Sequence, residues 1–270
     1  MNKITAWFMS IVMVVLGAVA VFIPFGNPIS RFLAKENAQT YIEENHPDTD
    51  YTVDAVNYDF KTGNYYVQVK SPASPDSSFT LYAGTNGKIS YSTYESAVKD
   101  KWNTANRIGD EYWYQTKALF ESDKFPYNQH IAFGEIIWKE SGIAEGETMP
   151  EYAVSTKDLV LDGVYDVKDF SQKAGRLTVY IYDNEVSAER LAEILLGIRK
   201  IFDENNVSFY MIDCILEYPR PENDDEPHKE GRCEVLGFLY SDIYEDALVE
   251  RVRLADEKAK EHWAKLDALK

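Results

Sequence analysis

Residues 177–182 read Leu-Thr-Val-Tyr-Ile-Tyr, and residues 187–202 read Ser-Ala-Glu-Arg-Leu-Ala-Glu-Ile-Leu-Leu-Gly-Ile-Arg-Lys-Ile-Phe. In the first segment aliphatic side chains alternate with Thr and Tyr, which is typical of a half-buried β-strand. In the second, apolar residues recur at helical spacing after Ser187, a residue type that favours the N-cap position. These segments therefore predict a strand followed by a capped amphipathic helix.

The residues that follow complete a small α+β unit. Residues 207–218 and 232–240 read as two further strands, and a charged loop over 219–231 joins them. Asp242 to Glu245 has the spacing of a capping box and opens a long terminal helix. The order β-α-β-β-α predicts a parallel first pair of strands, then an antiparallel hairpin, in an α+β sandwich whose helices cover one face of the sheet.

The only two cysteines lie on the two strands of this hairpin. In a symmetric antiparallel hairpin Cys214 and Cys233 fall opposite each other, with both side chains on the same face. We therefore predict a disulfide between Cys214 and Cys233, which an oxidising location outside the cytoplasm would preserve. The alternative is a pair of buried free thiols, expected if the domain faces the cytoplasm or if a bulge shifts the register.

The N-terminal half has a simpler pattern, a helix followed by a small antiparallel sheet. Residues 28–46 place apolar side chains at helical spacing, and residues 51–82 contain three short strands separated by turns. A second helix begins near a capping box at Ser92 to Glu95. We expect a helix-plus-sheet domain over 28–121, a connector over 122–150 and a C-terminal α+β domain over 151–270.

The segment before residue 28 is strongly apolar. No charged residue occurs between Ile4 and Phe25, and a spanning helix needs about 20 apolar residues. The run predicts a single transmembrane helix, with residues 1–27 as an anchor that makes the membrane an integral partner and leaves the globular part outside the cytoplasm. The alternative is a signal peptide cleaved after Ala18-Val-Ala20, although the apolar run is longer than such segments usually are.

Charge and motif content exclude several functions. The net charge of −17 repels nucleic acid and argues against it as a partner. We find no nucleophile elbow, zinc-protease motif, phosphate loop or dinucleotide fingerprint. No histidine has a second His or Cys at metal-ligand spacing, and His46 and His262 are interpreted as surface residues. The sequence therefore predicts no catalytic residue, no cofactor and no metal site.

Two clusters invite a binding interpretation. The loop from Glu222 to Glu226, followed by His228, is the densest acidic run, but its spacing does not match a calcium-binding loop. We interpret it as a solvated hairpin loop. Tyr65-Tyr66 and the aromatic residues in 111–114 have the composition of a stacking platform, and packing between helix and sheet is the interpretation that we favour.

The N-terminal part resembles a known family. The apolar run, Ala38-Gln-Thr-Tyr-Ile-Glu-Glu-Asn-His-Pro47, Val56-Asn-Tyr-Asp-Phe60 and Gly63-Asn-Tyr-Tyr66 are similar to YfjL-like proteins of Gram-positive bacteria. The resemblance covers about residues 1–120, and residues 183–219 are similar to longer members. It implies a PepSY-like N-terminal domain, a helix packed on a short antiparallel sheet. By analogy with PepSY-like modules it also implies an extracytoplasmic binding or regulatory role, and it brings no catalytic residue.

Three functions are consistent with these observations. The first is a membrane-anchored, extracytoplasmic, non-catalytic module that binds or regulates a protein partner. The second is a carboxylate-dependent hydrolase of the cell envelope, which a perturbed carboxylate pair in a deep pocket would favour. The third is an envelope protein that binds divalent cations through the acidic loop.

Overall fold

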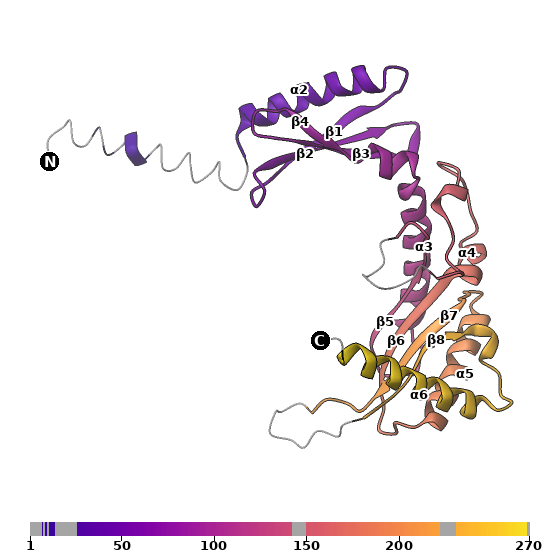
Figure 1. Cartoon of the computed structure of the whole chain (residues 1–270). Coiled ribbons are helices and arrows are strands. Elements are labelled where there is room, and N and C mark those ends of the chain that lie inside the picture. Colours follow the sequence, from indigo (N-terminus) through magenta and orange to yellow (C-terminus); the bar gives the residue numbers. More distant parts are fainter. Residues whose placement is uncertain are drawn as a thin grey trace. The chain divides into compact units, whose positions relative to one another are not determined.

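The computed structural model describes residues 7, 9, 11–13, 26–141, 150–221 and 231–268. The chain forms two compact units (Figure 1). Unit 1 comprises Met1–Thr104 with Lys157–Gly163, and unit 2 comprises Ala105–Thr156 with Val164–Lys270. Each unit contains one four-stranded sheet, in the order β1-β2-β3-β4 or β5-β6-β7-β8, so the fold class is α+β.

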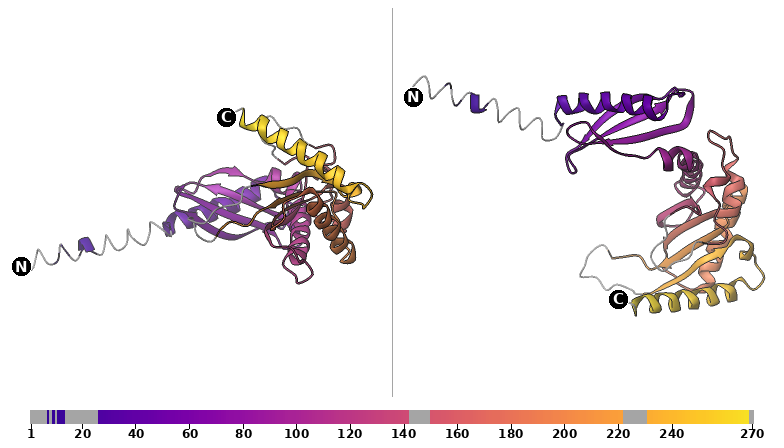
Figure 2. Two further views of the ribbon diagram at one scale, coloured as in Figure 1. Left: turned by 90° about the horizontal axis from the view of Figure 1, so that it is seen from below. Right: turned by 45° about the horizontal axis from the view of Figure 1, so that its top comes forward.

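Unit 1 is a helix packed on an antiparallel sheet, as the sequence predicts. Asn27 caps the helix by accepting a hydrogen bond from the Ile29 amide at 2.9 Å, and Pro28 occupies the first turn, where no amide donor is needed. The helix lies across one face of the sheet (Figures 1 and 2). The elements are α2 (Pro28–Asn45), β1 (Thr52–Asp59), β2 (Asn64–Ser71), β3 (Ser74–Ala83), β4 (Ile89–Ser92) and the π-helical turn η1 (Glu95–Lys99).

The core of unit 1 follows from two sequence periods. Ala34, Ala38 and Ile42 recur along the buried side of α2, while Tyr65, Val67 and Val69 alternate along β2. The small alanines let the helix approach the sheet closely. The opposite face of the sheet is formed by the residues that alternate with the buried ones, and we call it the outer face.

Unit 2 contains the predicted β-α-β-β-α order, preceded by two further α-helices and a strand. The strands β6 and β7 pair in parallel and β7 and β8 pair antiparallel, both as predicted. Strand β5 adds an antiparallel edge next to β6, within the segment 122–150. The elements are α3 (Trp102–Phe120), β5 (Gln129–Ile136), α4 (Val167–Ala174), β6 (Gly175–Tyr182), α5 (Ala188–Glu204), β7 (Met211–Glu217), β8 (Arg232–Leu239), η3 (Tyr240–Asp242) and α6 (Leu248–Asp267), and η2 (Thr156–Asp158) crosses the unit boundary.

Alternation along β6 separates the two faces of the unit 2 sheet. Leu177 and Val179 are fully buried, and they pair with Ile212 and Cys214 of β7. Helix α5, which Ser187 caps by accepting a hydrogen bond from the Arg190 amide at 3.1 Å, supplies a second set of fully buried side chains. The residues that alternate with this core, including Arg176, form the second face, which we call the open face.

Helix α6 protects the edge of this sheet. The buried carboxylate of Asp256 accepts a hydrogen bond from the backbone amide of Glu234 on the edge strand β8, at 2.9 Å. Lys260, one turn further along the helix, donates to the other oxygen of Asp256 at 2.5 Å. An exposed strand edge would offer unpaired amides to another chain, and α6 occupies that position here.

The predicted fold class needs one correction, at the N-terminus. Of the span predicted between residues 4 and 25, the structure describes Trp7, Met9 and 11–13, which are helical, and the rest lies outside the described residues. Among all described residues no helix is long and apolar enough to cross a membrane. The longest, α6, carries charged side chains throughout, which hydrocarbon disfavours. The N-terminal transmembrane helix, and the integral membrane association that it implied, are therefore not supported.

The register of the β7–β8 hairpin also differs from the symmetric one. Cys214 pairs with Val235, and Cys233 pairs with Leu216, so the cysteines are diagonal neighbours on one face. The pairing at Cys214 is displaced by two residues from the symmetric register. Beyond Cys214 a bulge changes the register again, because two residues of β8 face the single residue between Ile212 and Cys214. Both thiols are free and buried in the structure. The predicted Cys214–Cys233 disulfide stays a prediction.

Candidate binding site

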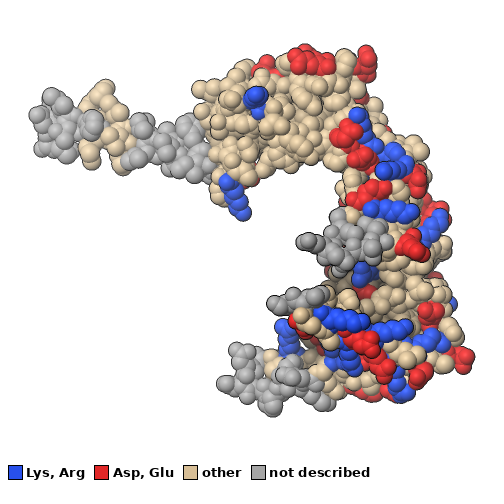
Figure 3. Space-filling model, in the orientation of Figure 1, with Lys and Arg blue, Asp and Glu red and all other residues tan. Residues whose placement is uncertain are grey.

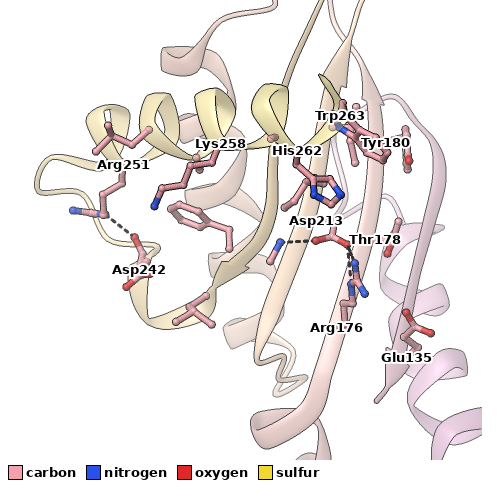
Figure 4. A pocket seen from close by; sticks show the side chains of 18 residues that line it. Glu135, Arg176, Thr178, Tyr180, Asp213, Asp242, Arg251, Lys258, His262 and Trp263 are labelled. Atoms are coloured by element: carbon pink, nitrogen blue, oxygen red, sulfur yellow. Dashed lines mark hydrogen bonds and ion pairs between the residues drawn. The ribbon is translucent and has the colours of Figure 1, made fainter. Parts of the chain in front are cut away.

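A cavity of about 840 Å³ lies between the open face of the unit 2 sheet and helix α6 (Figure 4). We call it the α6 cleft. Its size falls in the range of small-molecule and cofactor sites, about 300–1,000 Å³. The residues of the cleft that bear on its chemistry are Glu135, Arg176, Thr178, Tyr180, Asp213, Phe238, Asp242, Arg251, Lys258, His262 and Trp263.

The floor of the cleft is built by strand register. Arg176, Thr178 and Tyr180 occupy alternate positions of β6, so all three point away from the core. The pairing of β5 with β6 sets Glu135 beside Arg176, and the parallel pairing of β6 with β7 sets Asp213 on the same face. Charged side chains from three strands therefore converge on one surface.

Arg176 and Asp213 form a fixed ion pair at the centre of the floor. The guanidinium donates from Nε to Asp213 Oδ2 at 2.8 Å and also from Nη2 to the same oxygen. The second oxygen, Oδ1, accepts a hydrogen bond from the backbone amide of Gly237 at 2.6 Å. Only 4% of Asp213 is exposed, and these donors compensate the burial of its carboxylate.

Gly237 supplies its amide because of the bulge in β8. Its φ is +62°, in the left-handed region that residues with a β-carbon rarely adopt. This conformation lies where the register shifts, opposite Asp213. The bulge thus turns a backbone donor toward a buried acid, and both oxygens of Asp213 are engaged.

Glu135 lies next to the Arg176–Asp213 pair on the neighbouring strand β5. It lies at the rim of the cleft, where part of its side chain reaches solvent, and among the described residues no hydrogen bond or ion pair engages its carboxylate. Partial burial raises the pKa of Glu135, an effect that Arg176 opposes and Asp213 reinforces. The carboxylate is therefore destabilised in its charged form and gains from a cationic partner.

The wall formed by α6 carries positive charge. Arg251 is committed to structure: it donates to the backbone oxygens of Asp242, Tyr244 and Asp246 at 3.1, 2.7 and 2.6 Å, and its guanidinium lies over the Tyr244 ring. Lys258 lies two turns further along and points into the cleft (Figure 4). Among the described residues nothing forms an ion pair or hydrogen bond with its ammonium group. On the face of unit 2 that Figure 3 shows, acidic and basic side chains are interspersed.

Aromatic side chains complete the walls. Trp263 is 38% exposed, and the guanidinium of Arg232 lies 5.2 Å from the centre of its ring. Arg232 is itself held by the carboxylate of Glu234 at 2.8 Å. Tyr180 and Phe238 add rings from the sheet. These surfaces can bury the apolar part of a ligand between the charged groups.

The structure distributes the residues singled out from sequence over several places. His262 lines the cleft as an exposed residue, whereas His46 is half-buried among aromatic rings of unit 1. The acidic run 222–226 and His228 lie outside the described residues. In the described part of the chain no three His, Cys, Asp or Glu side chains are grouped to hold a metal ion.

The aromatic candidates separate into buried and exposed residues. Tyr65 is 1% exposed in the core of unit 1, and Tyr112 is fully buried, which agrees with packing for these two. Tyr66 lies on the outer face of the unit 1 sheet, and Trp113 and Tyr114 are exposed on α3.

Sequence reasoning missed the residues that build the cleft. The available signal was a single acid in an otherwise apolar strand, Met211-Ile-Asp-Cys-Ile-Leu216, because an isolated buried charge needs a partner. That partner, Arg176, lies before the first apolar residue of β6, at a distance in sequence that no local pattern reveals.

The fold and the cleft together define an α+β protein with two sheet-containing units and a ligand-sized cleft under its terminal helix. The chain belongs to the YfjL-like family: residues 1–93 match the model described as YfjL-like, N-terminal domain, and residues 111–253 match the YfjL-like C-terminal domain. No curated protein and no solved structure matches the chain.

Proposed function

We propose that this protein is a non-catalytic binding module and that the α6 cleft holds a polypeptide segment carrying both a basic and an acidic group. The observation that carries the proposal is two charged side chains on opposite sides of the cleft that have no ion-pair or hydrogen-bond partner among the described residues. Glu135 on β5 and Lys258 on α6 line one cavity, and in the view of Figure 4 the fixed Arg176–Asp213 pair lies between them. A ligand with charges of both signs satisfies both walls at once.

The fixed ion pair supports recognition rather than catalysis. A general acid or base needs an oxygen or nitrogen free to exchange a proton with the substrate. Both oxygens of Asp213 accept hydrogen bonds within the protein, so this carboxylate positions Arg176 and the Gly237 bulge instead. Glu135 alone does not form the carboxylate pair that the hydrolase hypothesis requires.

The remaining features of the cleft favour a peptide over other ligands of mixed charge. Trp263, Tyr180 and Phe238 offer ring surface to apolar side chains, and Thr178 offers a hydroxyl to a peptide group. A nucleotide or polyanion would meet the unpaired carboxylate of Glu135 in the same cavity, and that repulsion opposes its attraction to Lys258.

The test is an NMR titration of the isotopically labelled full chain with a pool of random octapeptides. The chemical shifts of the backbone amides report where the peptides bind. The proposal expects shifts that cluster at Arg176, Gly237 and Lys258. Lys258→Glu should weaken the pool's apparent affinity by about tenfold or more, the loss of roughly one charge pair in a partly desolvated cleft. The matched control is Lys265→Glu, on the same helix but outside the cleft, which should leave affinity unchanged. Shifts confined to other surfaces would overturn the proposal.

A further inference from the structure

Three tyrosines form a row across the outer face of the unit 1 sheet. Tyr66 of β2 pairs with Tyr82 of β3, and Tyr82 pairs with Tyr91 of β4. The ring centres of Tyr66 and Tyr82 are 4.8 Å apart, and those of Tyr82 and Tyr91 are 5.5 Å apart. We call these three residues the tyrosine row.

The row is not part of the core that α2 covers. The neighbouring residues Tyr65, Leu81 and Ala83 point to the helix side and are almost fully buried, so alternation directs the row to the other side. Tyr91 is 59% exposed. At the other end the Tyr66 hydroxyl donates to Asp59 at 2.9 Å, which holds that ring in place. The row therefore presents fixed aromatic surface to solvent.

A polar cavity of about 500 Å³ adjoins the row on the same strands. Gln68 and Thr80 pair with each other and line this cavity. Gln68 lies two residues after Tyr66 on β2, and Thr80 lies two residues before Tyr82 on β3. Ser78, Thr93 and Asn103 add further hydroxyl and carboxamide groups. Among the described residues, the charged side chains that line it are Asp54 and Lys70, which form an ion pair with each other. The lining is thus hydrogen-bonding but electrically neutral.

We propose that the tyrosine row and this cavity form a binding site for a neutral carbohydrate chain. A sugar ring presents C–H groups on one face, which stack on aromatic rings, and hydroxyl groups at its rim, which exchange hydrogen bonds with amides and hydroxyls. A row of rings on neighbouring strands, beside a hydroxyl- and carboxamide-lined hollow, matches this combination. A charged ligand would find no free partner of opposite sign in the cavity and would lose solvation there.

The test uses the full chain with two neutral probes, cellohexaose and the N-acetylglucosamine hexamer, and an acidic one, hexagalacturonate, in calorimetric titrations. The site should bind at least one neutral probe and should not bind the acidic one. Tyr91→Ala should weaken that binding by about tenfold, the typical worth of one aromatic stacking contact. Tyr91→Phe keeps the ring and should retain binding within a few-fold. Tyr114→Ala is the matched control, since Tyr114 is 65% exposed on α3 outside the row.

Gln68→Ala tests the polar half of the site in the same titrations. Loss of the carboxamide should weaken binding of the neutral probe while melting temperature stays unchanged, because Gln68 is exposed. Absence of binding for both neutral probes would overturn the proposal. Equal effects of Tyr91→Ala and Tyr114→Ala would also overturn it, since the row would then only stabilise the sheet through cross-strand pairing.

Discussion

The guanidinium of Arg176 binds the buried carboxylate of Asp213 through two nitrogen atoms that share one oxygen, and the amide of Gly237 binds the other oxygen. The pair joins β6 to β7 and anchors the bulge in β8. It therefore links the stability of unit 2 to the shape of the α6 cleft.

Removal of the buried acid should destabilise the protein substantially. Asp213→Ala leaves the half-buried Arg176 charge and the Gly237 amide without partners, which we expect to cost about 2–4 kcal/mol in the free energy of unfolding. Urea denaturation measures this change. Glu189→Ala is the control, because Glu189 pairs with Arg253 on the surface, where an ion pair contributes little to stability. Similar losses in the free energy of unfolding for the two variants would show that the buried Asp213 network contributes no more to stability than a surface ion pair.

Neutralising Glu135 should stabilise the protein at neutral pH. Burial raises the folded-state pKa of Glu135 above its ordinary 4.5, so the folded state favours the protonated form. The stabilising contribution of Glu135 to the free energy of unfolding is therefore present below pH 4.5 and is lost as pH rises through the folded-state pKa. At pH 7 the charged carboxylate destabilises the folded state relative to a neutral side chain. Glu135→Gln should therefore raise the urea midpoint at pH 7 but have little effect at pH 4. A gain that is equal at both pH values would contradict this sign.

His46 should make unit 1 less stable as the solution becomes acidic. Its ring lies 4.2 Å from that of Tyr94 and 5.5 Å from that of Phe79, and burial, aided by Lys99, lowers the pKa of His46. The unfolded chain therefore takes up a proton near pH 6.5 before the folded state does, and stability falls as pH drops below that value.

The measurement for His46 compares wild type with His46→Phe at pH 7.5 and 5.5. The melting temperature of the wild type should fall more between pH 7.5 and pH 5.5 than that of the variant, because the variant lacks the titrating ring. If both proteins lose the same amount, other groups account for the acid sensitivity.

The cysteines should be unreactive in the folded, reduced protein. Burial is the main cause that raises the pKa of Cys233 to about 12, and burial also raises the pKa of Cys214 strongly. Because the thiolate is the reactive form, alkylation at pH 8 should be slow until denaturant is added, and should then reach two thiols per chain. Rapid alkylation without denaturant would contradict the burial. The same titration of unreduced, denatured protein tests the disulfide, since two free thiols would refute it.

Local patterns were sufficient for much of the C-terminal fold. The Ser187 cap, the alternation that buries Leu177 and Val179, and the parallel pairing of β6 with β7 all follow from short-range sequence signals and from handedness rules. These features need no knowledge of distant partners, because each is decided by a few neighbouring residues.

Other elements depend on contacts that no local pattern contains. The capping-box spacing at Asp242 to Glu245 predicts a helix there, yet α6 begins at Leu248. Arg251 reaches back to the carbonyls of this segment and holds it as a loop. The cysteine register also differs from the symmetric one, because Cys214 pairs with Val235, two residues beyond Cys233, and no local pattern in either strand sets that offset. The cleft itself joins residues from β5 and α6 that are more than one hundred positions apart.

The most direct test of the account is a reversal of charge order in the α6 cleft. Two peptide sets would be compared, one with an acidic residue before a basic residue and one with the order inverted, against wild type and the double variant Glu135→Lys/Lys258→Glu. Wild type should prefer one order, and the double variant should prefer the other, because the signs of the two walls are exchanged. An unchanged preference, or equal binding of both sets by both proteins, would contradict peptide recognition through Glu135 and Lys258.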